Sequence, residues 1–302
     1  MSAVGETNVI AATGPLSAAL HPCPLCRSCD FKPLFGSIQR CRYCRLVQVN
    51  PITLYRGENE TEEYFLHDYL KLHEANRENS LAERREHIRF MRRSFQLPAS
   101  PRMLDVGCAL GFMLQEANAL GWHAEGVETS EFAARYAAER TGCRVHVGTL
   151  QRANLQPESF DVVTAMDVIE HIPEPLEFVQ EVYRILRPGG VMFIVTPNFS
   201  SFFARLYGPS AYAVWPDQHV VYFDPSTISH LLRKAGFKQV KTGSKDFYAE
   251  NLRRLFRRNG VPSSEIKGAF GKQRSLRVVR QFVNECFMHV RLGDKLLAVA
   301  RK

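Results

Sequence analysis

The chain has 302 residues, a formal net charge of +8 and 45% hydrophobic residues. This length allows one large domain and a small one, and the hydrophobic fraction is sufficient for a buried core. No apolar run approaches the roughly 20 residues of a membrane-spanning helix, and the N-terminus lacks the basic and apolar regions of an export signal, so a cytoplasmic protein is expected.

Cysteines and positive charge are both concentrated in short segments. Five of the eight cysteines fall within residues 23–44 and the others are scattered, which favours a reducing compartment over a disulfide framework. Residues 251–280 hold nine basic side chains and one acid, and so account for the whole net charge. This segment predicts an anionic partner, namely a phosphate-bearing substrate, a membrane surface or nucleic acid, although a solvated helix face explains it equally well.

Residues 1–20 are small and polar, and we expect them to be disordered. Residues 21–50 contain two C-x-x-C pairs, Cys23/Cys26 and Cys41/Cys44, which fourteen residues separate. This spacing predicts a zinc ribbon in which four thiolates hold one structural zinc ion and leave no open position for catalysis. Cys29 is a possible substitute ligand, but it competes with Cys23 for the turn at Cys26.

Residues 102–128 have the pattern of a strand, a tight glycine turn, a helix and a second strand. The first strand carries Asp105 near its end, Gly107 and Gly111 frame the turn, the helix covers 113–120, and the second strand ends on Glu128. This is half of a nucleotide-binding α/β unit with ligand-facing groups at the strand tips.

The glycine turn is not expected to bind a dinucleotide. Such a site requires G-x-G-x-x-G, whereas Ala109 stands between Gly107 and Gly111 here and Asp105 would repel a pyrophosphate. S-adenosylmethionine suits these residues better, because Asp105 can face its cationic end while Glu128 accepts hydrogen bonds from both ribose hydroxyls.

Four segments resemble, in order and spacing, the motifs of class I S-adenosylmethionine-dependent methyltransferases. They are 104–111 (LDVGCALG), 126–130 (GVETS), 160–171 (FDVVTAMDVIEH) and 186–190 (LRPGG). The branch that the chain resembles most contains the ubiquinone-biosynthesis O-methyltransferases and small-molecule methyltransferases with an N-terminal zinc ribbon. The resemblance, over residues 20–50 and 85–302, implies an α/β fold: a seven-stranded, mostly parallel Rossmann-like sheet in residues 98–302 with helices on both faces.

The resemblance also implies a set of cofactor contacts. In many relatives an acid after the third strand holds the adenine amino group, but Thr149 stands in this loop, so backbone groups near Leu150 are expected to replace it. The implied cofactor-binding residues are Asp105, Gly107, Cys108, Gly111, Glu128, Thr129, Leu150, Met166 and Asp167. A lid helix is expected at 76–95, after a linker that begins at residue 51; Tyr64, Tyr69 and His73 either line this lid or serve in packing.

The remaining elements follow from hydrophobic periodicity and from Gly and Pro positions. We expect helices at 131–140, with Ser130 as N-cap, at 174–186 and at 225–235. Strands are expected at 144–147, 160–166 and 191–196, and an antiparallel edge pair at 238–248 and 293–300. The basic segment lies in an insertion, 249–292, before the last strand.

Residues 198–223 are the expected acceptor-pocket insertion. Phe199, Phe202, Phe203, Leu206 and Tyr207 fall at helical spacing on one face, which fits packing over the sheet, a hydrophobic acceptor pocket or shallow insertion into a membrane. The resemblance implies His219 or His171 as the general base, although a structural role explains each of them too.

The predicted reaction is O-methylation of a hydroxyl on a sugar, a phenol or quinone, or a lipid-linked metabolite. A nucleic-acid methyltransferase that uses the ribbon and residues 251–280 is the first alternative, but no Asn-Pro-Pro-Tyr-like motif follows the strand at 160–166. A non-catalytic cofactor-binding scaffold is the second, and the presence of both Asp105 and Glu128 disfavours it. No feature of the sequence indicates an oligomeric state.

Overall fold

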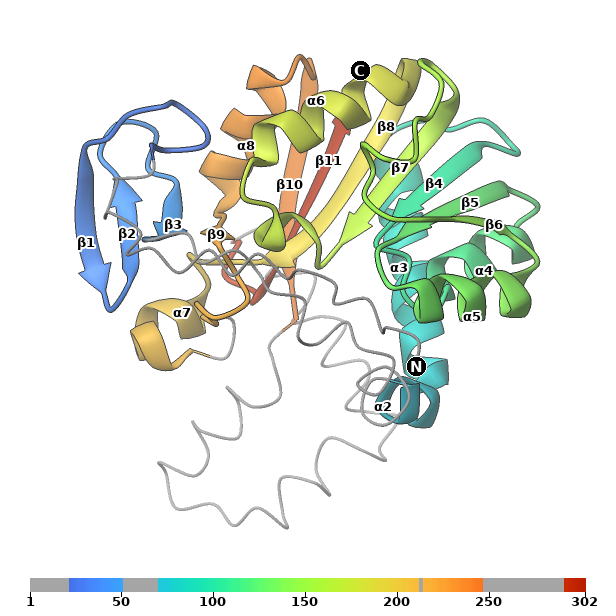
Figure 1. Cartoon of the computed structure of the whole chain (residues 1–302), viewed down its shortest axis with the longest axis horizontal. Coiled ribbons are helices and arrows are strands. Elements are labelled where there is room, and N and C mark those ends of the chain that lie inside the picture. Colours follow the sequence, from blue (N-terminus) through green and yellow to red (C-terminus); the bar gives the residue numbers. More distant parts are fainter. Residues whose placement is uncertain (1–21, 51–69, 212–213, 247–290) are drawn as a thin grey trace, which may run out of the picture.

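The computed structural model of the chain describes residues 22–50, 70–211, 214–246 and 291–302 (Figure 1). The expected disordered N-terminus, the linker up to residue 69 and nearly all of the basic insertion lie outside the described residues. Among the helices that are described, none combines the length and the apolar character needed to cross a bilayer.

The larger sheet has seven strands in the order β10-β11-β8-β7-β4-β5-β6 (Figure 1). Neighbours from β8 to β6 pair in parallel, whereas β11 is antiparallel to both β8 and β10. This order confirms the predicted fold. The bounds are β4 (Arg102–Val106), β5 (His123–Glu128), β6 (Arg144–Val147), β7 (Phe160–Met166), β8 (Leu186–Pro197), β10 (Gln239–Lys245) and β11 (Lys295–Arg301).

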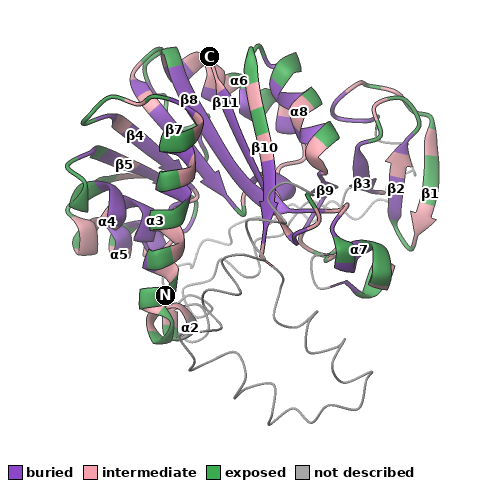
Figure 2. Cartoon of the chain, turned by 180° about the vertical axis from the view of Figure 1, so that it is seen from behind, coloured by how far each residue is buried: buried purple, intermediate pink, exposed green. Residues whose placement is uncertain are grey.

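Helices cover both faces of this sheet because successive strand residues point to opposite sides. Met103 packs in one apolar core with α3 (Arg77–Ser94), α4 (Phe112–Ala119) and α5 (Glu131–Thr141). The next residue, Leu104, belongs to a second core with α6 (Pro175–Ile185) and α8 (Pro225–Lys234). The central strands β7 and β8 are therefore buried on both faces, while the edge strand β10 is partly exposed (Figure 2).

The helix boundaries agree with most of the sequence-based expectations. The predicted lid helix is α3, preceded by the short α2 (Leu70–Ala75), and the Ser130 hydroxyl accepts a hydrogen bond from the Ala133 amide as an N-cap. The segment at 186–190 differs, since β8 already begins at Leu186, where we predicted the end of a helix. The Arg187 guanidinium donates to both carboxylate oxygens of Asp161 on β7 at 2.9 Å, which attaches the start of β8 to its neighbouring strand.

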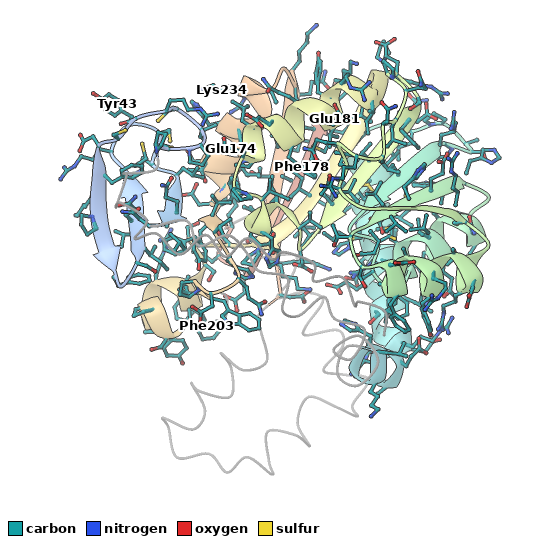
Figure 3. The ribbon with its side chains drawn as sticks, viewed as in Figure 1. Tyr43, Glu174, Phe178, Glu181, Phe203 and Lys234 are labelled. Atoms are coloured by element: carbon teal, nitrogen blue, oxygen red, sulfur yellow. The ribbon has the colours of Figure 1, made fainter. Side chains whose placement is uncertain are left out.

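The segment at 22–50, which carries the two cysteine pairs of the predicted ribbon, is joined to the rest of the fold by strand pairing. Its strands β1 (Phe31–Phe35), β2 (Ile38–Cys41) and β3 (Val47–Val49) are antiparallel, and β3 pairs with β9 (Val221–Tyr222) to form a four-stranded sheet. Arg27 also pairs with Glu174 at 3.0 Å, and the Lys234 ammonium donates to the Leu25 carbonyl. Glu174 and Lys234 come from the side of the larger sheet and its helices that lies next to this segment (Figure 3).

The predicted helix at 199–207 is wrong in its beginning and in its single apolar face. Helix α7 runs over Phe202–Tyr207, because the Ser201 hydroxyl caps it by accepting from the Ala204 amide at 3.0 Å, and η4 (Gly208–Ser210) follows. Phe199 precedes the helix and packs against Phe35 of the ribbon and Tyr222 of β9. Within α7, Phe203 is buried, while Phe202 and Leu206 are 44% and 45% exposed.

Candidate active site

The glycine turn between β4 and α4 is shaped by close packing. Gly107 and Gly111 have φ values of 70° and 77°, a region that favours glycine. A Cβ atom at Gly107 would lie 2.5 Å from Cγ2 of Val168, and one at Gly111 would lie 3.1 Å from side-chain atoms of Ala137 and Thr141. Both glycines are therefore required by the fold, because a side chain at either position would collide with neighbouring residues.

Glu128, at the end of β5, fixes this turn through its carboxylate. One oxygen accepts from the Ala109 amide at 2.8 Å; the other accepts from the Ser130 amide at 3.0 Å and from the Thr129 hydroxyl at 3.3 Å. Ala109 has a φ of 44°, in the left-handed region. Since a carboxylate offers about four acceptor positions and Thr129 is exposed, Glu128 retains the capacity to accept hydroxyls of a ligand.

Asp105 lies deeper than a strand-tip residue was expected to lie. Its side chain is only 1% exposed, and the Thr164 hydroxyl donates to it at 2.5 Å. Burial raises the pKa of Asp105 to about 7, against the lowering effect of the Thr164 hydrogen bond. At neutral pH this carboxyl group is thus poised between its two protonation states.

Three other predicted cofactor residues direct their side chains into the cores. Cys108 belongs to the core with α4, close enough to Gly126 that an added Cβ there would lie 2.7 Å from its sulfur, and burial raises the pKa of its thiol. Leu150 and Met166 are 2% and 9% exposed. Asp167, in contrast, is exposed at the tip of β7 with a φ of 54°.

A group of charged residues that the motifs did not indicate surrounds this edge of the sheet. On α3, Glu83 accepts from the Lys295 ammonium of β11 at 2.6 Å. Burial, followed by the charge of Arg84, lowers the pKa of His73, and Arg84 also offsets part of the rise that burial causes in the pKa of Asp105. Against the effect of burial, the charges of Glu83 and then Asp167 raise the pKa of Lys295. Cations of α3 and β11 are therefore close to the acids of β4 and β7.

One signal in the sequence could have located Arg84. It lies three residues after Leu81 and four before Ile88, both of which are buried on the apolar face of α3. A charged residue in the middle of an apolar helical stripe is worth attention, because burial of a charge is costly unless the site uses it.

The two histidines proposed as bases lie together. The rings of His171, in η3 (Ile169–His171), and His219 are 5.0 Å apart and nearly perpendicular. His171 Nδ1 lies 2.9 Å from the Gln218 carbonyl, and because a carbonyl can only accept, Nδ1 carries the proton in the neutral ring and Nε2 is the unprotonated nitrogen. Burial lowers the pKa of His171, partly offset by this hydrogen bond and by Asp167.

Aromatic residues and a buried acid complete this part of the site. The rings of Trp215 and Tyr222 lie 6.2 and 5.9 Å from that of His219. Glu170 is 2% exposed and accepts from the Thr196 hydroxyl at 2.9 Å. Burial, followed by the charge of Asp167, raises the pKa of Glu170 to about 8.

Two groups of side chains have the composition of a metal site. Ligand atoms of Glu170, His171 and His219 lie within 4.8 Å of one another. A cation there would need Glu170 in its ionised form, whereas burial in the absence of a cation raises the pKa of this carboxyl group.

The second group is the four predicted cysteines. The sulfurs of Cys23 and Cys44, and those of Cys26 and Cys41, are 3.4 Å apart, and all four fall within 4.8 Å. Hydrogen bonding with Cys44 lowers the pKa of the Cys23 thiol to about 5. Four thiolates about 2.3 Å from a tetrahedral Zn²⁺ would be spaced about 3.8 Å apart, so this donor set fits zinc.

Comparison with known proteins identifies the family of the chain. The family model described as a methyltransferase domain matches residues 72–242. A relative named ubiquinone biosynthesis O-methyltransferase, from Aromatoleum aromaticum, is 32% identical over 152 residues. That match covers 46% of this chain and 65% of the relative, so the chain spans just under two thirds of that protein's length.

Solved structures show the same fold at low identity. A SAM-dependent methyltransferase from Archaeoglobus fulgidus is 20% identical with a TM-score of 0.54, and the match covers 78% of this chain and 100% of that one. A possible histamine N-methyltransferase from Thermotoga maritima is 21% identical with a TM-score of 0.53, over 80% and 97% of the two chains. At this level of identity the comparison establishes the α/β architecture alone.

Proposed function

Because the chain belongs to the methyltransferase-domain family, with the class I S-adenosylmethionine-dependent fold, we propose that it transfers a methyl group from S-adenosylmethionine to a hydroxyl of a small molecule. The observation that carries the proposal is the Glu128 carboxylate, which ties the glycine turn to the end of β5. The name of the curated relative favours an oxygen acceptor on a phenol or quinone, and a sugar or lipid-linked hydroxyl has the same chemistry.

In this proposal the cofactor lies along the carboxyl edge of β4, β5 and β7. Glu128 accepts the ribose hydroxyls, Asp105 and Asp167 face the cationic end, and Arg84 or Lys295 binds the carboxylate of the methionyl part. Gly107 and Gly111 allow the backbone to approach, and backbone groups of Cys108 and Leu150 with the edge of Met166 complete the contacts. Bound S-adenosylmethionine supplies an electrophilic methyl group on a sulfonium.

The reaction then needs positioning and one proton acceptor. The acceptor oxygen forms a bond to the methyl carbon while the carbon–sulfur bond breaks, which leaves a neutral thioether. His171 Nε2, or His219, takes the hydroxyl proton. The buried Tyr222 and the partly exposed Trp215 flank the ring of His219. The proposal is tested by screening hydroxylated metabolites for release of S-adenosylhomocysteine. If none of a broad set of acceptors gives release, the result counts against the proposal.

The Asp105 assignment predicts proton release on cofactor binding. Because its pKa is about 7 without ligand, a facing cation should lower the pKa and release about half a proton per site at pH 7. Titration calorimetry in buffers with different ionisation enthalpies measures this number. The release should vanish well above pH 7, where the carboxyl group is already ionised, and should be absent in Asp105→Asn. Equal release by wild type and variant would show that Asp105 does not face the cation.

The histidine pair predicts a pH-dependent turnover. A base must be neutral to accept a proton, and burial lowers the pKa of His171, so kcat should rise with pH to a midpoint below the ordinary value of about 6.5 and then stay level. We expect His171→Ala or His219→Ala to lower kcat by about 10²–10⁴-fold, the usual contribution of a positioned base.

The exposed His123, at the start of β5, provides the matched control. His123→Ala should retain full turnover, and affinity for S-adenosylhomocysteine should be unchanged in all three variants. Near-normal turnover in both His171→Ala and His219→Ala would exclude the pair as the base. Turnover that chelator treatment abolishes and a divalent cation restores would instead assign the pair and Glu170 to a metal.

A further inference from the structure

A groove lies beside the edge strand β10, away from the strand ends where the cofactor is proposed to bind. It has a volume of about 820 Å³ and is bounded by α7, α8, the edge strand β10 and the residues just before β11. Three arginines line it, Arg205 on α7, Arg233 on α8 and Arg291 before β11. The groove thus gathers positive charge from three segments that are far apart in the sequence.

These three arginines have no acidic partner among the residues that the structure describes. Some other described arginines do form ion pairs with acids, as Arg184 on α6 does with Glu181 at 2.6 Å and Arg187 on β8 does with Asp161 at 2.9 Å. Asp224 is the acid in the wall of the groove, and one of its oxygens accepts from the amides of residues 226 and 227 as the N-cap of α8. With three arginines and this one acid, the groove remains net positive.

The fourth basic residue of the groove, Lys241, already has a hydrogen-bond partner outside it. The Lys241 ammonium donates to the Ser94 carbonyl at 2.6 Å and so points to α3. Ser226 and Thr242 also line the groove, and their hydroxyl groups can donate hydrogen bonds. The available groups are therefore hydrogen-bond donors, and three of them carry a fixed positive charge.

Donors of this kind match a phosphate group. Guanidinium groups bind phosphate oxygens by paired, charge-assisted hydrogen bonds, and hydroxyls add further donors. Three cations that face one groove repel one another, a cost that a dianionic ligand removes. Apolar area is small in this groove, so an uncharged or hydrophobic ligand has little to contact.

We propose that this groove binds a phosphate or pyrophosphate group. The groove is also near the acceptor site along the chain. Ser200 in its wall donates its hydroxyl to Asn198, which bridges to Phe223, four residues after His219. If the function proposed above is correct, the bound group belongs to the acceptor, which is then a phosphorylated or pyrophosphate-linked hydroxyl compound. Phosphate binding itself does not depend on that function.

Calorimetry with inorganic pyrophosphate, at constant ionic strength, tests the site on the full chain. We expect the triple variant Arg205→Gln, Arg233→Gln and Arg291→Gln to bind pyrophosphate at least about tenfold more weakly, a loss equivalent to 1.4 kcal/mol. The matched control neutralises three exposed arginines on α3, α5 and β6, namely Arg89, Arg135 and Arg144, and should leave the affinity unchanged.

Several results would overturn the site. They are no pyrophosphate binding by the wild type, equal losses in the two triple variants, and loss only when Arg253, Arg254, Arg257 and Arg258 are neutralised. S-adenosylhomocysteine affinity, measured on the same samples, should be unchanged in the groove variant. A wild type that binds pyrophosphate but not S-adenosylhomocysteine would reject the proposed function and retain the groove.

The source of the phosphate is distinguished by vesicle sedimentation. Wild-type protein that sediments with phosphatidylcholine vesicles containing phosphatidic acid, but not with phosphatidylcholine alone, would identify a lipid phosphate, provided that the groove variant does not sediment and pyrophosphate competes. Pyrophosphate binding without sedimentation would identify a soluble phosphorylated ligand. Sedimentation that the groove variant retains would show that vesicles bind elsewhere, and the calorimetry then decides the groove.

Discussion

Glu128→Ala should abolish measurable binding of S-adenosylmethionine at micromolar concentrations. The variant loses two charge-assisted hydrogen bonds to the ribose, each worth about 1.5–3 kcal/mol, so we expect the affinity to fall by about 10²–10⁴-fold. It also removes the acceptor for the Ala109 and Ser130 amides, and the turn that approaches the cofactor is no longer held against β5. Titration calorimetry with S-adenosylmethionine and S-adenosylhomocysteine measures the effect.

The loss of stability must be separated from the loss of binding. Two amides that lose their partner cost about 1–3 kcal/mol each, so Glu128→Ala should also unfold at lower temperature, and binding must be measured well below that transition. Glu125→Ala is the matched control, because Glu125 lies on the same strand but bonds Arg102 and His146 at the opposite end. It should keep full affinity. Tight binding of NAD by the wild type, with no heat from S-adenosylmethionine, would contradict the cofactor assignment altogether.

The sequence was most informative where a residue type has one structural use. Glycines at 107 and 111 predicted a tight turn, and the structure places both in the left-handed region against neighbours that leave no room for a side chain. The resemblance of the motifs predicted a mostly parallel sheet, and in the structure β4 pairs in parallel with both β5 and β7. Ser130 as an N-cap is a further example, since its hydroxyl satisfies an amide that the helix itself cannot.

The sequence was least informative where the partner is distant in the chain. The pairing of β3 with β9 joins residues about 170 positions apart and leaves no local pattern. Spacing alone predicted Phe199 as part of a helix, but in the structure it precedes α7 and packs against Phe35 and Tyr222. The burial of Asp105 was likewise missed, because its depth depends on Thr164 of the neighbouring strand.

Substitution of one cysteine of the proposed zinc site, Cys41→Ser, should lower turnover by about 10²-fold while leaving cofactor affinity nearly intact. Zinc binding supplies about 10–16 kcal/mol in model fingers, so loss of the ion should loosen the segment at 22–50 even though it also packs against the larger sheet. Beta-strand pairing from Val47 and Gln48 to β9, with the hydrogen bond from the Val49 amide to the Val220 carbonyl at 3.0 Å, then ties the ribbon to the residue after His219. A displacement of about 1 Å in a catalytic group costs on the order of 10²-fold in rate.

The exposed Cys29 lies outside the four-sulfur cluster and gives the matched control. Cys29→Ser should keep one zinc per chain by mass spectrometry and normal turnover, whereas Cys41→Ser should lose both, together with hydrogen-exchange protection across 219–223. Val49→Pro isolates the connection, because it removes the amide that bonds Val220 but spares every thiolate. If it retains zinc and loses turnover, the ribbon acts by positioning His219. If Val49→Pro and Cys41→Ser both keep full turnover, the ribbon has no part in the chemistry.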